Sequence, residues 1–250
     1  MKGAASAPPL IRQAFHSESS NLWSESGINL DQQSLIFDAQ DVDLFSTQNP
    51  LADIEKAIKK LLDQNYLPIS LGGDHSISYP ILKAFAEKFD KLNILQFDAH
   101  PDLYDEYQGN RFSHACPFTR IMEAYLVQRL VQVGIRTMND HQQQQVERFG
   151  VEVIQMQDWR DDIKLKFDNP LYISFDMDAL DPAFAPGVSH YEPGGFTTRQ
   201  VINIIHNIET PLIVGADIVE FNPLRDQNGM TAMVGAKILK ELAGKMLTLI

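Results

Sequence analysis

The stretch Asp98-Ala99-His100-Pro101-Asp102 places three potential metal ligands within five residues, directly after the apolar run Ile94-Leu95-Gln96-Phe97. Such a run is typical of a buried strand, and ligands bind beyond the carboxyl ends of the strands in an α/β sheet. Carboxylates buried at that depth are costly unless a group of opposite charge lies beside them. A bound cation is the simplest source of that charge.

Two more apolar runs lead into residues of the same kind. Leu171-Tyr172-Ile173-Ser174-Phe175 is followed by Asp176-Met177-Asp178, and Leu67-Pro68-Ile69-Ser70-Leu71 is followed by Gly72-Gly73-Asp74-His75. The two glycines permit a tight turn that can direct the His75 imidazole toward the same place. We therefore expect three strand ends to converge on one polar site.

The alternative for each residue taken alone is a turn or a helix cap, because these positions favour Asp, Asn and Ser. Three separate strand ends that all carry Asp or His are harder to explain in this way. The spacing Asp-x-His-x-Asp also has no common use in capping. The combination therefore favours a shared binding site.

Apolar runs and helical periodicity alternate along most of the chain, which is typical of βαβ units. The pattern predicts a three-layer α/β/α fold with a mainly parallel sheet, in one domain that spans residues 1–250. Strands are expected at 67–71, 93–97, 130–135, 151–154, 171–175 and 212–216, and helices at 50–62, 79–89, 118–129, 140–148, 198–209 and 230–246. The long segment 178–196 is rich in Pro, Gly and Asp and is expected to be a functional loop.

Composition narrows the classes of function. The net charge of −12 disfavours binding to nucleic acid or anionic membranes and favours a small cationic ligand. One cysteine, Cys116, excludes an internal disulfide and a thiolate-rich zinc site, and we interpret it as structural. No apolar stretch reaches the length of a membrane span, and the first nine residues lack the apolar segment of a secretory signal. A cytoplasmic location is the default expectation.

Four motifs together resemble the ureohydrolase family of arginases and agmatinases. They are Gly-Gly-Asp-His-Ser at 72–76, Asp-Ala-His-Pro-Asp at 98–102, Ser-Phe-Asp-Met-Asp-Ala-Leu-Asp-Pro at 174–182 and Asp-Ile-Val-Glu-Phe-Asn-Pro at 217–223. The segments 180–195 and 219–236 are most similar to those of plant-type arginases and bacterial agmatinase-like proteins. The motifs occur in the family's order over most of the chain.

The resemblance implies a binuclear hydrolase that cleaves a guanidino group to urea and an amine, using two Mn²⁺ ions per subunit that activate a water. The implied ligands are His75, Asp98, His100, Asp102, Asp176 and Asp178. Asp98 and Asp176 would bridge the ions, with His75 and Asp102 on one ion and His100 and Asp178 on the other. Four carboxylates and two imidazoles are a hard donor set that suits Mn²⁺.

By the same resemblance the catalytic residues are His114, Glu220 and the ligand Asp102. His114 would carry protons to the leaving amine, and Glu220 would pair with the guanidinium. The alternatives are a surface loop residue for His114 and a salt bridge with Arg225 for Glu220. Asp74, Asp181 and Asp217 are expected to orient ligands or close turns, and His190 and Glu192 to face the substrate.

Two features depart from the family pattern. The first strand of the family is expected to be missing, because Met1 lies where that strand should already have ended. Tyr104 stands where animal-type arginases place an Asn that helps to bind the α-carboxylate, although plant-type arginases share this style of loop. Agmatine is therefore the preferred substrate, with arginine or another guanidino acid as alternatives.

The resemblance also implies a homo-oligomer, either a trimer or a hexamer. Two alternatives of other classes are a single-zinc deacetylase of the same fold and an inactive binding or scaffold protein. The complete set of six ligands, together with His114 and Glu220, argues against both.

Overall fold

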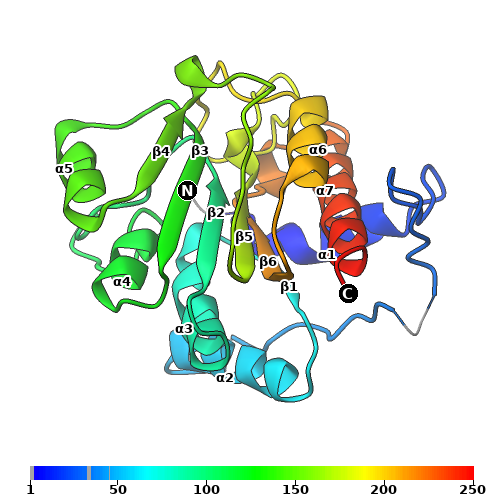
Figure 1. Ribbon diagram of the computed structural model, residues 1–250. Coiled ribbons are helices and arrows are strands. Elements are labelled where there is room, and N and C mark those ends of the chain that lie inside the picture. Colours follow the sequence, from blue (N-terminus) through cyan, green and yellow to red (C-terminus); the bar gives the residue numbers. More distant parts are fainter. Residues whose placement is uncertain (1–2, 33–34, 45) are drawn as a thin grey trace.

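The computed structural model describes residues 3–32, 35–44 and 46–250 of the chain. Its centre is a sheet of six parallel strands in the order β1-β6-β5-β2-β3-β4. Figure 1 shows these strands side by side in the middle of the molecule. The strands are β1 (Ile69–Leu71), β2 (Asn93–Phe97), β3 (Arg129–Ile135), β4 (Glu152–Gln155), β5 (Leu171–Asp176) and β6 (Ile213–Val219). The predicted parallel α/β fold is confirmed.

Helices cover both faces of the sheet and form the outer layers (Figure 1). One face packs against α1 (Ala7–Phe15), α6 (Thr198–Asn207) and α7 (Met230–Leu247), and the other against α2 (Pro50–Asp63), α3 (Ser78–Lys88), α4 (Pro117–Glu123) and α5 (Asp140–Phe149). Among these described helices, none is both long and apolar enough to cross a membrane.

Alternate residues of the central strands supply the two cores. Leu95 and Ile173 lie in the core beneath α6 and α7, whereas Ile94 and Tyr172 lie in the core beneath α2 and α3. All of the residues of β2, β5 and β6 are buried. Burial on both faces explains why these strands are continuous apolar runs in the sequence.

Several helix starts follow from side-chain capping. Asn49 accepts a hydrogen bond from the Ala52 amide at the start of α2, and both α5 and α6 begin with a capping box, Asn139 with Gln142 and Thr197 with Gln200. Such caps satisfy amide groups that have no partner inside the helix. The predicted helices at these positions are confirmed.

Two elements differ from the sequence prediction. The helix expected over 118–129 ends at Glu123, because the nearby Tyr125 adopts a left-handed backbone with φ 52°. Helix α1 was not predicted. The expected loss of a first strand concerns Met1 and Lys2, which lie outside the described residues, and β1 is the first strand in the part of the chain that is described.

Strand register places the ends of three strands side by side. Phe97 of β2 pairs with Phe175 of β5, and Asp176 of β5 pairs with Val219 of β6. The residues that follow, Asp98 and Glu220, therefore leave the sheet at the same level as Asp176. This edge of the sheet carries the residues predicted to form the site.

Gly134 is the last residue but one of β3 and lies near this edge. Its replacement tests how closely the chain is packed there. Gly134 has φ 92°, and an added Cβ would lie 2.8 Å from Phe196 and 3.0 Å from the Asp98 carbonyl oxygen. Gly150 also has a positive φ, 65°, but nothing lies within 4 Å of an added Cβ. We expect Gly150→Ala to cost about 1 kcal/mol of unfolding free energy, and Gly134→Ala about 2–4 kcal/mol, because overpacking adds to backbone strain. Urea denaturation measures both, and equal losses would show that the contacts with Phe196 and Asp98 do not matter.

Candidate metal centre

Six residues gather at the carboxyl edge of the sheet, and they fall into two overlapping groups. His75, Asp98 and Asp102 form one group whose ligand atoms all lie within 4.8 Å of one another, and Asp98, His100 and Asp178 form the other. Asp98 belongs to both groups. Asp176 adjoins the first group, with its Oδ2 atom 3.2 Å from His75 Nδ1. The three predicted strand ends are therefore brought together.

The spacing of the ligand atoms matches that of donors around a common ion. His75 Nδ1 lies 3.0 Å from Asp102 Oδ2 and 3.2 Å from Asp98 Oδ2, and His100 Nδ1 lies 3.1 Å from Asp178 Oδ2. Two donors at right angles on an ion with bonds of about 2.1 Å would lie about 3.0 Å apart. The residues present thus fit a metal centre.

A buried chain of hydrogen bonds orients the His75 ring. Ser174 Oγ donates to Asp217 Oδ1 at 2.7 Å, so its remaining contact, 2.9 Å from His75 Nε2, is one in which the ring donates. In the neutral ring this arrangement leaves Nδ1 without a proton, and Nδ1 is buried without a hydrogen-bond partner. A lone pair that faces three carboxylates is unfavourable unless a cation lies between them, and metal-bound histidines are held in this way through the other ring nitrogen.

The carboxylates are held by groups that were not singled out from the sequence. Gln96 donates to Asp98 Oδ2 at 2.7 Å, and Gln132 donates to Gln96 in turn. The Ala99 amide donates to Asp178 Oδ1 at 3.1 Å. Gln96 and Gln132 are polar residues inside otherwise apolar strands, and this is the signal that could have identified them.

The carboxylates of this cluster lie so close together that burial and their mutual repulsion shift their pKa values. Burial and the charge of Asp98 raise the pKa of Asp102 to about 7, and burial and the charge of Asp178 raise the pKa of Asp176 well above its usual range. Burial alone would lower the pKa of His100, but hydrogen bonds to Asp178 and Asp98 raise it to about 12. Neighbouring carboxylates of this kind cannot all stay ionised without positive charge among them.

His114 lies beside the centre, at the rim of the site. Its ring stacks on His190 with centroids 5.3 Å apart, and His190 contacts His100 edge-on at 6.1 Å. Burial lowers the pKa of both His114 and His190. Three histidine rings thus lead from the rim to the proposed ligands, and the stack itself was not predicted from the sequence.

Glu220 is buried directly after β6 with a left-handed backbone, φ 64°. Its Oε1 atom accepts a hydrogen bond of 3.0 Å from the His75 amide, so it supports the His75 turn. Burial and the charge of Asp74 raise its pKa to about 8. The Arg225 guanidinium lies over the Tyr191 ring, 4.1 Å from its centroid, and its Nε donates to the Tyr191 hydroxyl.

The other polar residues considered from the sequence close turns or lie in the core. Asp74 caps the turn at Ser76, and Asp181 accepts from the amides of Ala183, Gly194 and Gly195. Cys116 is buried, and burial raises the pKa of its thiol to about 11, which makes it a poor nucleophile at neutral pH.

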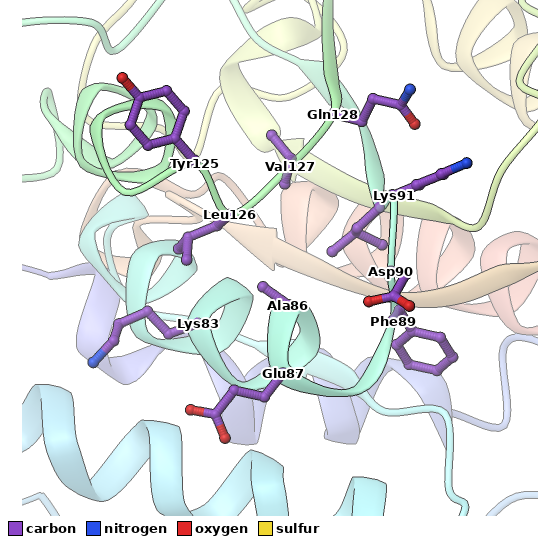
Figure 2. Close-up of a pocket in the computed structure, with 11 residues that line it drawn as sticks. Lys83, Ala86, Glu87, Phe89, Asp90, Lys91, Tyr125, Leu126, Val127 and Gln128 are labelled. Carbon is purple, nitrogen blue, oxygen red and sulfur yellow. The ribbon is translucent and has the colours of Figure 1, made fainter.

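A pocket of about 420 Å³ lies at the opposite edge of the sheet (Figure 2). Leu92 and Gln128, which line it, come immediately before β2 and β3. In α/β sheets ligands bind at the carboxyl ends of the strands. This pocket is therefore separate from the candidate centre, and none of the proposed ligands lines it.

Comparisons with known proteins agree on one family. A profile of the arginase family matches residues 1–244. The chain is 45% identical to "Arginase 1, mitochondrial" of Arabidopsis thaliana, over 98% of this chain and 77% of that protein. It is 33% identical to an agmatinase of Bacillus cereus, over 82% of this chain and 73% of the relative. The solved arginase of Medicago truncatula superimposes with a TM-score of 0.93 at 42% identity, over 98% and 82% of the two chains.

The expected cytoplasmic location is contradicted by these relatives, because several plant arginases that the chain matches are named mitochondrial or chloroplastic. The expectation depended on the lack of a membrane-length apolar stretch and of the apolar segment of a secretory signal.

Three findings indicate the same family: the match over residues 1–244, the identity with plant arginases and the arginase-like sheet. The chain belongs to the arginase family, and it is a ureohydrolase that acts on guanidino compounds.

Proposed function

We propose that this ureohydrolase is an arginase, which hydrolyses L-arginine to L-ornithine and urea. The observation that carries the proposal is the identity of 43–45% with several plant arginases, against 33% with an agmatinase. This reverses the preference for agmatine that followed from Tyr104. The expected homo-oligomer and the single domain over 1–250 stay predictions.

The proposed cofactor is a pair of Mn²⁺ ions. His75, Asp98 and Asp102 would hold one ion, and Asp98, His100 and Asp178 would hold the other, with Asp176 beside the first group. The donor set supports manganese, because carboxylates suit hard cations and the described part of the chain brings no thiolate to these groups. When bound, the pair supplies an activated water at neutral pH.

The side chains around the centre bind and orient the substrate. The Glu220 carboxylate is proposed to pair with the guanidinium group, since a planar fork of N–H donors matches a carboxylate in shape and charge. Its Oε1 atom already accepts from the His75 amide, which fixes the carboxylate at the edge of the centre. The guanidino carbon is thereby held beside the proposed ligands.

His114 is the proposed proton carrier for the leaving amine. Collapse of the tetrahedral intermediate breaks a C–N bond, and the departing nitrogen needs a proton. The His114 ring is half-buried and stacks on His190, so one edge can face the substrate while the loop reaches solvent. Histidine is suited to this exchange at neutral pH.

The choice between arginine and agmatine rests on the rim. Tyr104 stacks on His141 and accepts a hydrogen bond of 2.7 Å from Asn139 Nδ2. Tyr104 and Asn139 lie on the loops after β2 and β3, where the tail of a bound substrate would extend. Arginine carries an α-carboxylate and agmatine does not, so polar donors at this rim would favour arginine.

Substrate choice is tested by urea release from arginine, agmatine and guanidinobutyrate at equal concentrations after loading with Mn²⁺. We expect the highest kcat/KM for arginine. A higher kcat/KM for agmatine would replace arginase by agmatinase as the function. Loss of urea release from all three would contradict a ureohydrolase altogether.

The metal assignment predicts a specific effect of His100→Ala. The substitution removes one donor from the group with Asp98 and Asp178, so Mn²⁺ content should fall below two ions per chain. Urea release should fall by at least about 100-fold, because even residues behind the ligands contribute 10- to 100-fold. Elemental analysis and a urea assay measure the two effects.

The matched control for His100→Ala is His16→Ala, which alters an exposed histidine next to α1. It should leave both metal content and turnover unchanged. If His100→Ala retained two ions and normal turnover while folded, His100 would not be a ligand.

His114→Ala tests proton transfer separately from metal binding. We expect kcat to fall by about 10²- to 10⁴-fold, the usual contribution of a general acid or base, while Mn²⁺ content stays at the wild-type value. Added imidazole should restore part of kcat. An unchanged kcat would assign the proton to another group.

A further inference from the structure

Arg136 is the first residue after β3, and its guanidinium lies among backbone carbonyl groups. Nη2 donates to the carbonyls of Asp178 at 2.7 Å and Glu192 at 2.6 Å. Nε donates to Glu192 at 2.8 Å, and Nη1 donates to Gly134 at 3.1 Å. Longer contacts reach the carbonyls of Ala179 and Leu180. One side chain therefore holds the loop 178–180 and the segment around Glu192 together.

The backbone of Arg136 binds the other ligand loop. Its amide donates to the Ala99 carbonyl at 3.0 Å, and the next amide, of Thr137, donates to the same oxygen at 3.2 Å. Ala99 lies between the proposed ligands Asp98 and His100. Arg136 thus connects the loop that carries Asp98 and His100 with the loop that carries Asp178.

The loop around Glu192 also carries His190, which stacks on His114. Little space remains for this loop to move toward Arg136, since a Cβ added at Gly195 would lie 2.7 Å from Arg136 Nη2. The guanidinium is therefore enclosed by the chain on the side of the long loop. Its position is coupled to three segments that meet at the metal centre.

The planar guanidinium group of arginine suits this arrangement better than the ammonium group of lysine would. Arginine offers five donors in one plane, and here they satisfy carbonyls in several directions. Burial lowers the pKa of Arg136, while the charges of Asp178 and Asp98 act in the opposite sense. The acidic cluster thus helps to keep a positive charge in a partly buried place.

We propose that Arg136 is a positioning residue that fixes Asp178 relative to Asp98 and His100 and holds the His190 loop beside His114. This inference rests on the proposed function for its catalytic meaning. The structural claim is independent of substrate identity. It concerns the affinity of the group formed by Asp98, His100 and Asp178 for a divalent cation, and the order of the loop 178–196.

The test compares Arg136→Lys and Arg136→Met with matched changes at Arg160. Arg160 is exposed and also donates to backbone carbonyls, those of Gln157 and Trp159, but its segment carries no proposed ligand. Arg136→Lys keeps the charge and loses the fork. Arg136→Met loses both and keeps the length. Arg160→Lys and Arg160→Met repeat these changes away from the centre.

The first readout is Mn²⁺ binding, measured by titration of the metal-free protein. We expect Arg136→Met to weaken one of two binding events by roughly 10- to 100-fold, the usual effect of residues that orient ligands, and Arg136→Lys to weaken it less. The second readout is hydrogen exchange of amides in 178–196, which should accelerate in the Arg136 variants alone. The third readout is steady-state kinetics with arginine, in which kcat should fall by a larger factor than KM rises.

Unchanged Mn²⁺ binding together with unchanged exchange in 178–196 would overturn the proposal. A lower melting temperature with normal metal affinity would also overturn it, because that result describes a purely structural arginine. If Arg136→Met does not fold, Arg136→Lys decides by the same readouts. Metal binding and exchange are measured without substrate, so an error in the proposed activity leaves this test intact.

Discussion

The repulsion between carboxylates buried at one edge of the sheet is the constraint on which the site depends. Asp98, Asp176 and Asp178 are almost completely buried, and Asp102 nearly so. Burying these charges together costs far more free energy than a surface ion pair contributes, unless cations lie among them. The surrounding amides and glutamines fix the direction of each oxygen but add no positive charge. The chain therefore folds into a site whose donor groups fit divalent metal ions.

The parallel sheet makes this concentration of charge possible. Register aligns the ends of β2, β5 and β6, so that residues far apart in the sequence leave the sheet at one level. The rest of each strand is mostly apolar and buried on both faces, which holds the edge rigid. Left-handed backbones at Asp102 and Glu220, with φ 52° and 64°, show that the loops accept local strain to direct their carboxylates inward.

Most of the sheet and the proposed ligands could be predicted from the sequence because both leave local signals. Buried parallel strands are apolar runs, and Asp or His directly after such a run stands out. The early end of α4 could not be predicted in this way, because it depends on a left-handed turn at Tyr125, a residue type that does not favour one. The stack of His114 on His190 joins residues distant in sequence. The contacts of Arg136 go to backbone carbonyls, which leave no trace in residue identity.

The proposed metal ligands and the proposed site of substrate recognition lie on different parts of this architecture. The proposed ligands leave from strand ends, where register and burial allow little variation. Tyr104 and Asn139 lie farther out, on loops where their side chains form a hydrogen bond with each other, and loops tolerate change better than the strands beneath them. A substitution at the rim can thus alter recognition of the substrate tail while the charge balance of the centre is kept. For this reason membership of the family identifies the reaction class, and activity has to be measured to identify the substrate.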